Sequence, residues 1–213
     1  MLYIVTGGSG SGKSEYAEQT AVQCRNGNGG TLWYLATMRI WDDEGRKRVE
    51  RHRRMRAAKG FKTIERYTGL ETLELEERCE EYNSAGLDDE QENDSLKRWE
   101  SCRVAQKPVL LLECMSNLVL NEFYAQENGA QERILQGIKH LQNQCHDLII
   151  VTNEIFSDGA TYDLESERYI ELLGRINREL GQMADSVTEV VYGIPLAVST
   201  PVFAADERTK DVG

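Results

Sequence analysis

A glycine-rich segment near the N-terminus has the residue types and the spacing that bind a polyphosphate. It matches the pattern G-x-x-x-x-G-K-[ST] and consists of Gly7, Gly8, Ser9, Gly10, Ser11, Gly12, Lys13 and Ser14. Glycines let consecutive backbone N–H groups curve around phosphate oxygens, and the start of a helix adds partial positive charge. Lys13 would reach the β- and γ-phosphates, as a binding and catalytic residue, and the Ser14 hydroxyl would ligate Mg²⁺. The segment predicts a site for GTP or ATP with Mg²⁺.

A carboxylate at the end of an apolar run is the expected partner of such a loop. Glu113 ends the run Val109–Glu113 and is the second candidate metal ligand. If this run is a strand of the same sheet, its last side chain lies near the phosphates, because ligands bind at the carboxyl ends of parallel strands. The alternative is that Glu113 merely caps the segment that follows it.

Seven cations in eleven residues, from Arg46 to Arg56, stand out in an acidic protein. One interpretation is a solvated, charge-rich helix. A nucleic-acid patch is disfavoured, because no aromatic residues interleave for stacking. In the third interpretation this is a phosphate-handling surface with His52 as the nucleophile. Neighbouring arginines disfavour the imidazolium, so His52 would keep the neutral form that attacks phosphorus.

These candidates need elements that bring them to one edge of a sheet. Short apolar runs alternate with helical patterns, which predicts an α/β fold with a mostly parallel sheet. The predicted strands are Leu2–Thr6, Leu32–Thr37, Lys62–Arg66, Val109–Glu113, Leu148–Thr152 and Val187–Tyr192. Helices are expected after the phosphate loop, over Glu15–Cys24, and along the apolar stripes of residues 134–145 and 169–183.

Length and composition favour one domain with a core of its own. The 213 residues are 40% hydrophobic and 29% charged, which suits a folded protein. The domain is expected over residues 1–198, with an acidic surface excursion at about 71–105 and a loose tail over 199–213. Between Glu71 and Glu100 there are twelve acidic residues and three basic ones, a balance typical of a solvated surface.

The charge balance and the cysteines narrow the class of protein. The net charge of −11 argues against a surface that binds nucleic acid or anionic membrane as a whole. The chain shows no signal peptide and no apolar run of the length that a membrane span needs. Its five scattered cysteines resemble reduced thiols. We therefore expect a cytoplasmic enzyme that acts on a small molecule.

Over roughly residues 1–198, the chain resembles the bifunctional adenosylcobinamide kinase / adenosylcobinamide-phosphate guanylyltransferase family of cobalamin biosynthesis. The matching runs, in chain order, are IVTGGSGSGKSEYAE, WYLATMRIWDDE, RVERHRRMR, KTIER, LLLECMSNLVLNE, IIVTNE and GRINRELGQMADSVTEVVYGIPLAV. The phosphate loop alone is generic. The ordered combination, with His52 and Arg56 at a His-x-x-x-Arg spacing, is specific.

The resemblance implies a RecA-like P-loop NTPase fold, a mostly parallel central sheet flanked by helices, and two linked reactions. In the first, the hydroxyl of adenosylcobinamide attacks the γ-phosphate of ATP or GTP. In the second, a histidine attacks the α-phosphate of GTP, releases pyrophosphate and carries GMP as a phosphoramidate. The phosphate of the corrinoid then takes up the GMP to give adenosylcobinamide-GDP.

The resemblance also implies the residues that serve these reactions. The guanylylated histidine falls on His52. The family's nucleotide contacts outside the phosphate loop fall on Met38, Arg39, Ile40, Arg53, Arg54, Met55, Arg56, Glu65 and Glu113. Its members form trimers, so a homo-oligomer is expected, with a corrinoid and a nucleotide as the small-molecule partners.

One segment departs from the family pattern. After IIVTNE the family has a loop VGxGIVPxN, whereas this chain has Phe156 and Asp158 at the two glycine positions and lacks the proline. Bulky or acidic side chains there would fill or repel a ligand that glycine lets approach. Two other interpretations therefore stay open. One is a relative with another acceptor or a single half-reaction, and the other is a non-catalytic nucleotide sensor.

Overall fold

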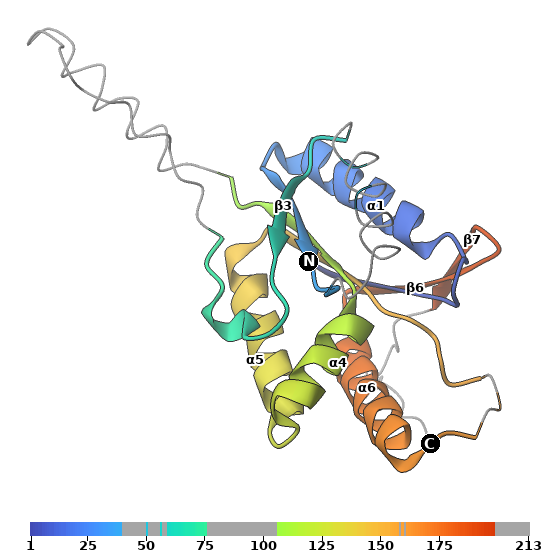
Figure 1. Ribbon diagram of the computed structural model, residues 1–213. Coiled ribbons are helices and arrows are strands. Elements are labelled where there is room, and N and C mark those ends of the chain that lie inside the picture. The colour runs from blue at the N-terminus through green and yellow to red at the C-terminus, as the bar shows by residue number, and fades with distance from the viewer. Residues whose placement is uncertain are drawn as a thin grey trace, which may run out of the picture.

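A mostly parallel sheet organises the chain, as seen in a computed structural model that describes residues 1–39, Glu50, Arg56, 59–75, 106–157, Gly159 and 161–198. Within these residues the sheet has seven strands in the order β3-β2-β4-β5-β1-β6-β7 (Figure 1). Their bounds are β1 Leu2–Thr6, β2 Leu32–Ala36, β3 Lys62–Glu65, β4 Val109–Glu113, β5 Asp147–Val151, β6 Ser186–Val191 and β7 Ile194–Val198. The six predicted strands are confirmed, each end within one residue of its expected place.

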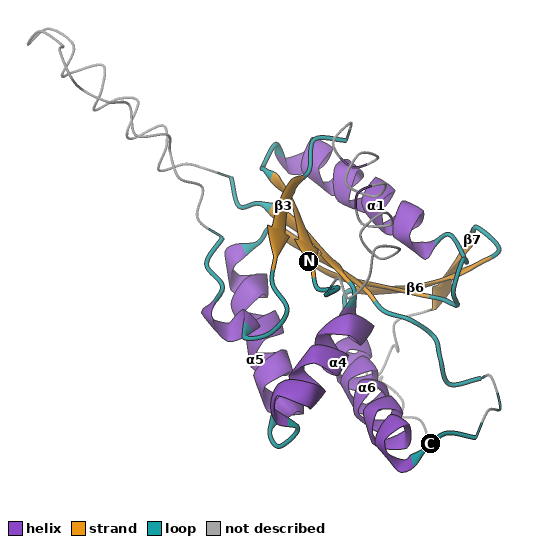
Figure 2. Ribbon diagram, viewed as in Figure 1, coloured by secondary structure: helices purple, strands orange, loops and turns teal. Residues whose placement is uncertain are grey.

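Helices cover both faces of this sheet (Figure 2). One face carries α1 (Lys13–Asn28), and the other carries α4 (Met115–Gln126), α5 (Ala130–Gln144) and α6 (Leu164–Met183). The apolar side chains of β1 alternate between the two layers. Leu2 and Ile4 pack with α4, α5 and α6, and Val5 packs with α1. The α/β prediction is thereby confirmed, with α1 longer than expected and α4 not predicted at all.

The last strand was also missed by the sequence analysis. β7 pairs antiparallel with β6 at the edge of the sheet, after a tight turn at Tyr192 and Gly193. All five of its residues are exposed, so it has no continuous buried run to reveal it. Pro195 also weakens a strand assignment, because proline within sheets is confined to edges, strand starts and bulges.

The register brings the carboxyl ends of the strands into one row. Glu65 pairs with Ala36, and Ala36 pairs with Glu113 on its other side. Glu113 pairs with Val151, which in turn pairs with Val5. The predicted acidic residues Glu65 and Glu113 therefore lie two strands apart, at the same edge as the start of the phosphate loop.

The first residues of the expected acidic excursion border the core, where Leu73 and Leu75 are partly buried. A short 3-10 helix, η1 (Leu70–Thr72), lies against α5, and the buried Leu70 joins the core. The backbone N–H of Leu75 donates to Gln144 Oε1 at 2.7 Å. Residues 76–105 and the predicted tail, 199–213, lie outside the described residues.

Candidate functional site

The phosphate loop joins β1 to α1 and has the geometry that its sequence predicts. Gly12 caps α1 with φ 92°, a left-handed conformation that favours glycine, and Lys13 begins the helix. The Lys13 ammonium donates to the backbone oxygen of Gly8 at 3.0 Å, which folds the side chain back over the loop. Burial lowers the pKa of Lys13, and the nearby Cys114 and Glu113 oppose this shift.

The β6–β7 hairpin packs directly against this loop. A Cβ on Gly7 would lie 2.5 Å from the Val190 oxygen, and one on Gly12 would lie 3.2 Å from the Gly193 Cα. The backbone N–H of Gly193 also donates to the Ser11 oxygen at 2.8 Å. The late run that ends in GIPL therefore supports the phosphate loop, a role that the sequence analysis missed. The two glycines are required here because any side chain would collide with the hairpin.

Ser14 and Glu113 are brought together as predicted. The Ser14 hydroxyl donates to Glu113 Oε1, across 99 residues of sequence. Tyr34 on β2, which the sequence analysis did not single out, donates its hydroxyl to Glu113 Oε2 at 3.0 Å. A hydroxyl and a carboxylate side by side at a phosphate loop are the oxygen donors that Mg²⁺ uses together with substrate phosphates. These residues therefore fit the predicted metal.

The backbone that follows Glu113 is anchored to the end of β2. The buried Thr37 donates its hydroxyl to the Cys114 oxygen at 2.7 Å and accepts the Cys114 N–H at 2.8 Å. The Asn121 side chain donates to the Thr37 oxygen at 2.8 Å, which adds a tie from α4. These bonds hold Glu113 in place because they fix the chain immediately after it.

Arg56, the last residue of the basic run, lies on the ring of Tyr34. Its guanidinium carbon is 3.5 Å from the ring centroid, and the side chain is 4% exposed. Phe61 meets the same ring edge-on, with the centroids 6.1 Å apart. A second tie nearby is the ion pair of Lys59 with the buried Glu18 on α1, at 2.5 Å. Arg56, which ends the basic run, thus contacts β2, and Lys59, three residues later, contacts α1.

The remaining predicted nucleotide contacts divide into two groups. Met38 and Arg39 follow β2 and Glu65 ends β3, so all three lie at the carboxyl edge of the sheet. Arg39 and Glu65 are exposed, and the Arg39 guanidinium lies over the ring of Tyr67 at 5.5 Å. Five predicted site residues fall outside the described residues: Ile40, His52, Arg53, Arg54 and Met55.

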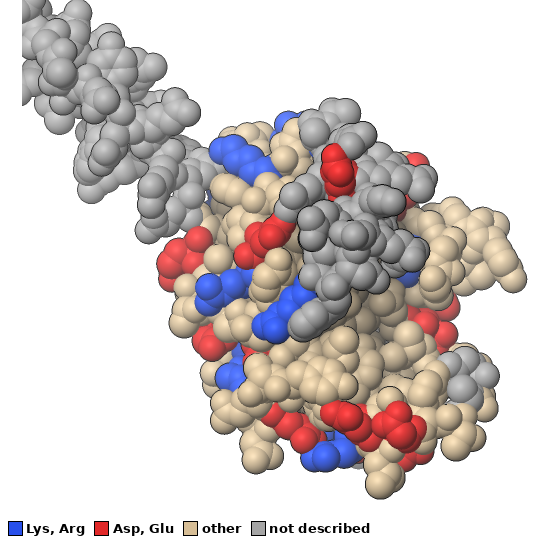
Figure 3. All heavy atoms as spheres, viewed as in Figure 1, with Lys and Arg blue, Asp and Glu red and all other residues tan. Residues whose placement is uncertain are grey.

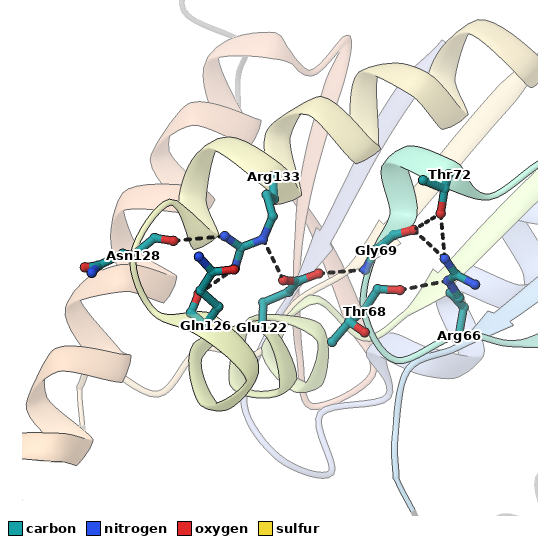
Figure 4. Close-up of polar contacts among 8 residues, drawn as sticks. All are labelled: Arg66, Thr68, Gly69, Thr72, Glu122, Gln126, Asn128 and Arg133. Atoms are coloured by element: carbon teal, nitrogen blue, oxygen red, sulfur yellow. Dashed lines mark hydrogen bonds and ion pairs between the residues drawn. The ribbon is translucent and has the colours of Figure 1, made fainter.

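A polar network fixes the loop that follows Glu65 (Figure 4). Arg66 donates to the Gly69 oxygen at 2.9 Å, and the Gly69 N–H donates to Glu122 Oε1 at 2.7 Å. The buried Glu122 on α4 also accepts from Arg133 Nε on α5, at 3.1 Å. A buried carboxylate with two strong donors is well satisfied, so this network is structural and holds the chain behind Glu65.

The segment that departs from the family pattern begins beside the phosphate loop. The Glu154 N–H donates to the Gly7 oxygen at 3.1 Å. Glu154 Oε1 then accepts from the Phe156 N–H at 2.8 Å and from the Ser157 hydroxyl at 2.9 Å. The Phe156 ring is 46% exposed, and an added Cβ on Gly174 in α6 would lie 3.5 Å from it. The turn is thus held by Glu154, with the ring beside α6.

A polar surface pocket lies elsewhere, between the α4–α5 turn and α6. Four of its charged groups form ion pairs: Arg168 meets Glu127 at 2.5 Å, and Arg175 meets Glu171 at 2.8 Å. On the face drawn in Figure 3, the described acidic and basic side chains are interspersed. We therefore place the candidate site at the phosphate loop.

Among the described helices, none has the length and apolar character to cross a membrane.

Comparison with known proteins shows which family the chain matches. The model of the family "Cobinamide kinase / cobinamide phosphate guanyltransferase" matches residues 3–90 and 76–198. The "Bifunctional adenosylcobalamin biosynthesis protein CobU" of Escherichia coli (strain K12) is 26% identical over 212 residues, covering 93% of this chain and 99% of the relative. The protein of the same name from Salmonella typhimurium (strain LT2) matches with the same identity and coverage.

A solved structure with a similar arrangement is the KaiC-like protein PH0186 from Pyrococcus horikoshii OT3. It is 14% identical, with a TM-score of 0.41, and the match covers 88% of this chain and 71% of that one. The family match runs from the first strand to the last and includes the phosphate loop, Glu113 and the β6–β7 hairpin. The chain belongs to the cobinamide kinase / cobinamide phosphate guanyltransferase family.

Proposed function

We propose that the protein is a nucleotide-dependent transferase that phosphorylates adenosylcobinamide and then transfers GMP to the product, giving adenosylcobinamide-GDP. The observation that carries this proposal is the family match over almost the whole chain. The meeting of Ser14 with Glu113 beside the phosphate loop supports it, because both transfers use a nucleoside triphosphate. The homologous enzymes make a transferase the consistent class.

In the kinase step, the phosphate loop holds the triphosphate through its backbone N–H groups and Lys13. Mg²⁺, when bound, neutralises charge that builds on the phosphoryl oxygens. Ser14 and Glu113 are the residues that would hold it. The corrinoid hydroxyl oxygen bonds to the γ-phosphorus, the bond from this phosphorus to the β–γ bridging oxygen breaks, the nucleoside diphosphate leaves with that oxygen, and the hydroxyl proton passes to water.

In the guanylyltransferase step, we assign the nucleophile to His52. Its unprotonated imidazole nitrogen bonds to the α-phosphorus of GTP, and pyrophosphate leaves. A phosphate oxygen of the corrinoid then displaces the imidazole from that phosphorus. Arg53, Arg54 and Arg56 would offset the charge of the triphosphate, because guanidinium groups form charge-assisted bonds to phosphate. Met38, Arg39, Ile40, Met55 and Glu65 complete the proposed nucleotide contacts.

The direct test is incubation of the protein with GTP, Mg²⁺ and adenosylcobinamide, followed by mass spectrometry of the products. We expect adenosylcobinamide phosphate, adenosylcobinamide-GDP and pyrophosphate that depends on the corrinoid. Formation of adenosylcobinamide phosphate without adenosylcobinamide-GDP would show that the protein has the kinase activity only. Nucleotide binding with no product of either kind would favour a sensor and contradict the proposal.

The turn at Phe156 favours a second candidate, a transferase with a different acceptor. We expect weak turnover of adenosylcobinamide by the natural chain, and better turnover after Phe156→Gly and Asp158→Gly together, because glycine opens the approach to the carboxyl edge. Initial rates at fixed GTP measure the effect. Ser157→Gly is the matched control, since it adds backbone freedom to the same turn and removes one bond to Glu154 but keeps the ring. Efficient turnover by the natural chain would show that the departure is neutral.

We also propose a homotrimer, in line with the family resemblance. The edge strand β7 offers a place for contact, because the exposed side chains of Ile194, Leu196 and Val198 follow Tyr192, which is 94% exposed. Exposed apolar side chains on an edge strand favour association. Sedimentation equilibrium should give about three times the mass of one chain, and Ile194→Lys with Leu196→Lys should lower it. A monomeric natural protein would contradict this proposal.

A further inference from the structure

We propose that Tyr34 is a positioning residue that orients the Glu113 carboxylate for the metal at the phosphate loop. This inference rests on the nucleotide- and metal-binding part of the proposed function and deepens it. The sequence gives Tyr34 no motif of its own, because it stands inside an apolar strand run. Its role comes from the contacts that the sheet creates.

The placement of Tyr34 follows from the register of β2 and β4. Ala36 pairs with Glu113, and Tyr34 lies two residues earlier on the same face of the sheet, where it pairs with Leu111. This face carries α1, whose first turn contains Ser14. Tyr34 and Ser14 therefore approach the Glu113 carboxylate from different elements. Tyr34 binds Oε2 at 3.0 Å, and Ser14 binds Oε1.

The two bonds to Glu113 have different chemical consequences. The Ser14 hydroxyl is expected to turn to Mg²⁺ when nucleotide binds, so its bond to Oε1 is exchangeable. The Tyr34 hydroxyl is not a metal ligand in this motif, and its bond to Oε2 can persist. It would then leave Oε1, the oxygen that faces Ser14, available to hold the metal. A carboxylate fixed in this way binds a metal better than one free to rotate, since outer partners orient metal ligands.

The Tyr34 ring is itself held from two sides. The Arg56 guanidinium covers its face at 3.5 Å, and Phe61 meets it edge-on at an interplanar angle of 86°. The residue is 5% exposed. Through Tyr34, Arg56 at the end of the basic run is also connected to the Glu113 carboxylate.

Tyr34→Phe tests this role, because it keeps the ring and removes only the hydroxyl. Affinity for a fluorescent GTP analogue is measured by titration with saturating Mg²⁺ and again in EDTA. We expect the gain in affinity due to Mg²⁺ to fall about tenfold or more, the scale of a bond to a charged group. The affinity in EDTA should stay within about twofold of the natural protein, because Lys13 and the loop are unchanged.

Tyr3→Phe is the matched control. It removes the hydroxyl of a partly buried tyrosine at the opposite end of the sheet, where the group contacts Met1 Sδ at 3.2 Å. The gain due to Mg²⁺ should be unchanged in this variant. Because each gain is a ratio measured on one variant, a modest loss of stability in Tyr34→Phe does not imitate the expected effect.

A double-mutant cycle with Glu113→Gln separates positioning from general packing. If Tyr34 acts through Glu113, Tyr34→Phe should hardly lower the Mg²⁺-dependent gain in GTP affinity when Glu113→Gln is already present. Equal gains in Tyr34→Phe and the natural protein, or full additivity in the cycle, would overturn the proposal for Tyr34 alone. A natural protein whose GTP affinity does not respond to Mg²⁺ would overturn the proposed metal-dependent function as well.

Discussion

Loss of the covalent GMP label is the result expected for His52→Ala. An imidazole nitrogen attacks an α-phosphate only when unprotonated, and the neighbouring arginines favour that form. After incubation with α-labelled GTP and Mg²⁺, the natural protein should carry one GMP per chain on the peptide that contains His52. The phosphoramidate should be labile in acid and stable in alkali. The variant should carry no label at all.

The His52→Ala variant should still bind GTP and transfer the γ-phosphoryl group, because we assign those functions to Lys13, Ser14 and Glu113. His140→Ala is the control, since this histidine lies on α5, where its ring nitrogen contacts the Leu73 oxygen at 3.1 Å. It should keep the full label. A label that survives in His52→Ala, or natural protein without any label, would refute the guanylyltransferase half of the proposed function.

A large loss of transfer is expected for Lys13→Ala. In the proposed function the ammonium group would form a charge-assisted contact to the transferred phosphates, and its removal would leave developing negative charge without that partner. By analogy with the loss of one preorganised donor, the rate should fall by about 100- to 1,000-fold, with weaker GTP binding as well. Steady-state rates and a binding titration measure the two effects separately.

Lys139→Ala is the matched control for charge, because this lysine is exposed on α5. It should leave both the rate and the affinity within about twofold, as is usual for a surface substitution. If Lys13→Ala bound and turned over GTP like the natural protein, the assignment of the phosphate loop would be wrong. The fold should survive the change, since the bond to the Gly8 oxygen is a single local contact.

The features that sequence predicted well are local. The phosphate loop is one contiguous motif, and its glycines, Lys13 and Ser14 occupy neighbouring positions whose geometry depends on a single strand-to-helix turn. The buried strands can be recognised in the sequence as apolar runs, as Val109–Glu113 can. Each of the six predicted strands ended within one residue of its expected place. Four of them, β1, β2, β4 and β5, are largely buried, which demands apolar side chains over their length.

The features that sequence missed depend on pairing between distant segments. Nothing around Tyr34 shows that its hydroxyl meets a carboxylate 79 residues later, although a buried tyrosine usually needs some partner. The hairpin turn at Gly193 showed no sign that it supports the phosphate loop. The site assigned to His52 remains a prediction, since that residue lies outside the described part of the chain.

Sequence alone was enough to predict the nucleotide-binding loop, six of the seven described strands and the family resemblance, because these are carried by residue types at short spacings. The contact of Tyr34 with Glu113 and the packing of Arg56 on the Tyr34 ring became visible only in three dimensions. Strand order and register set Glu113 beside Ser14 and Tyr34, and they place Arg56 on the Tyr34 ring. Such contacts depend on how strands far apart in the chain are aligned in the sheet, and no short stretch of residues specifies that alignment.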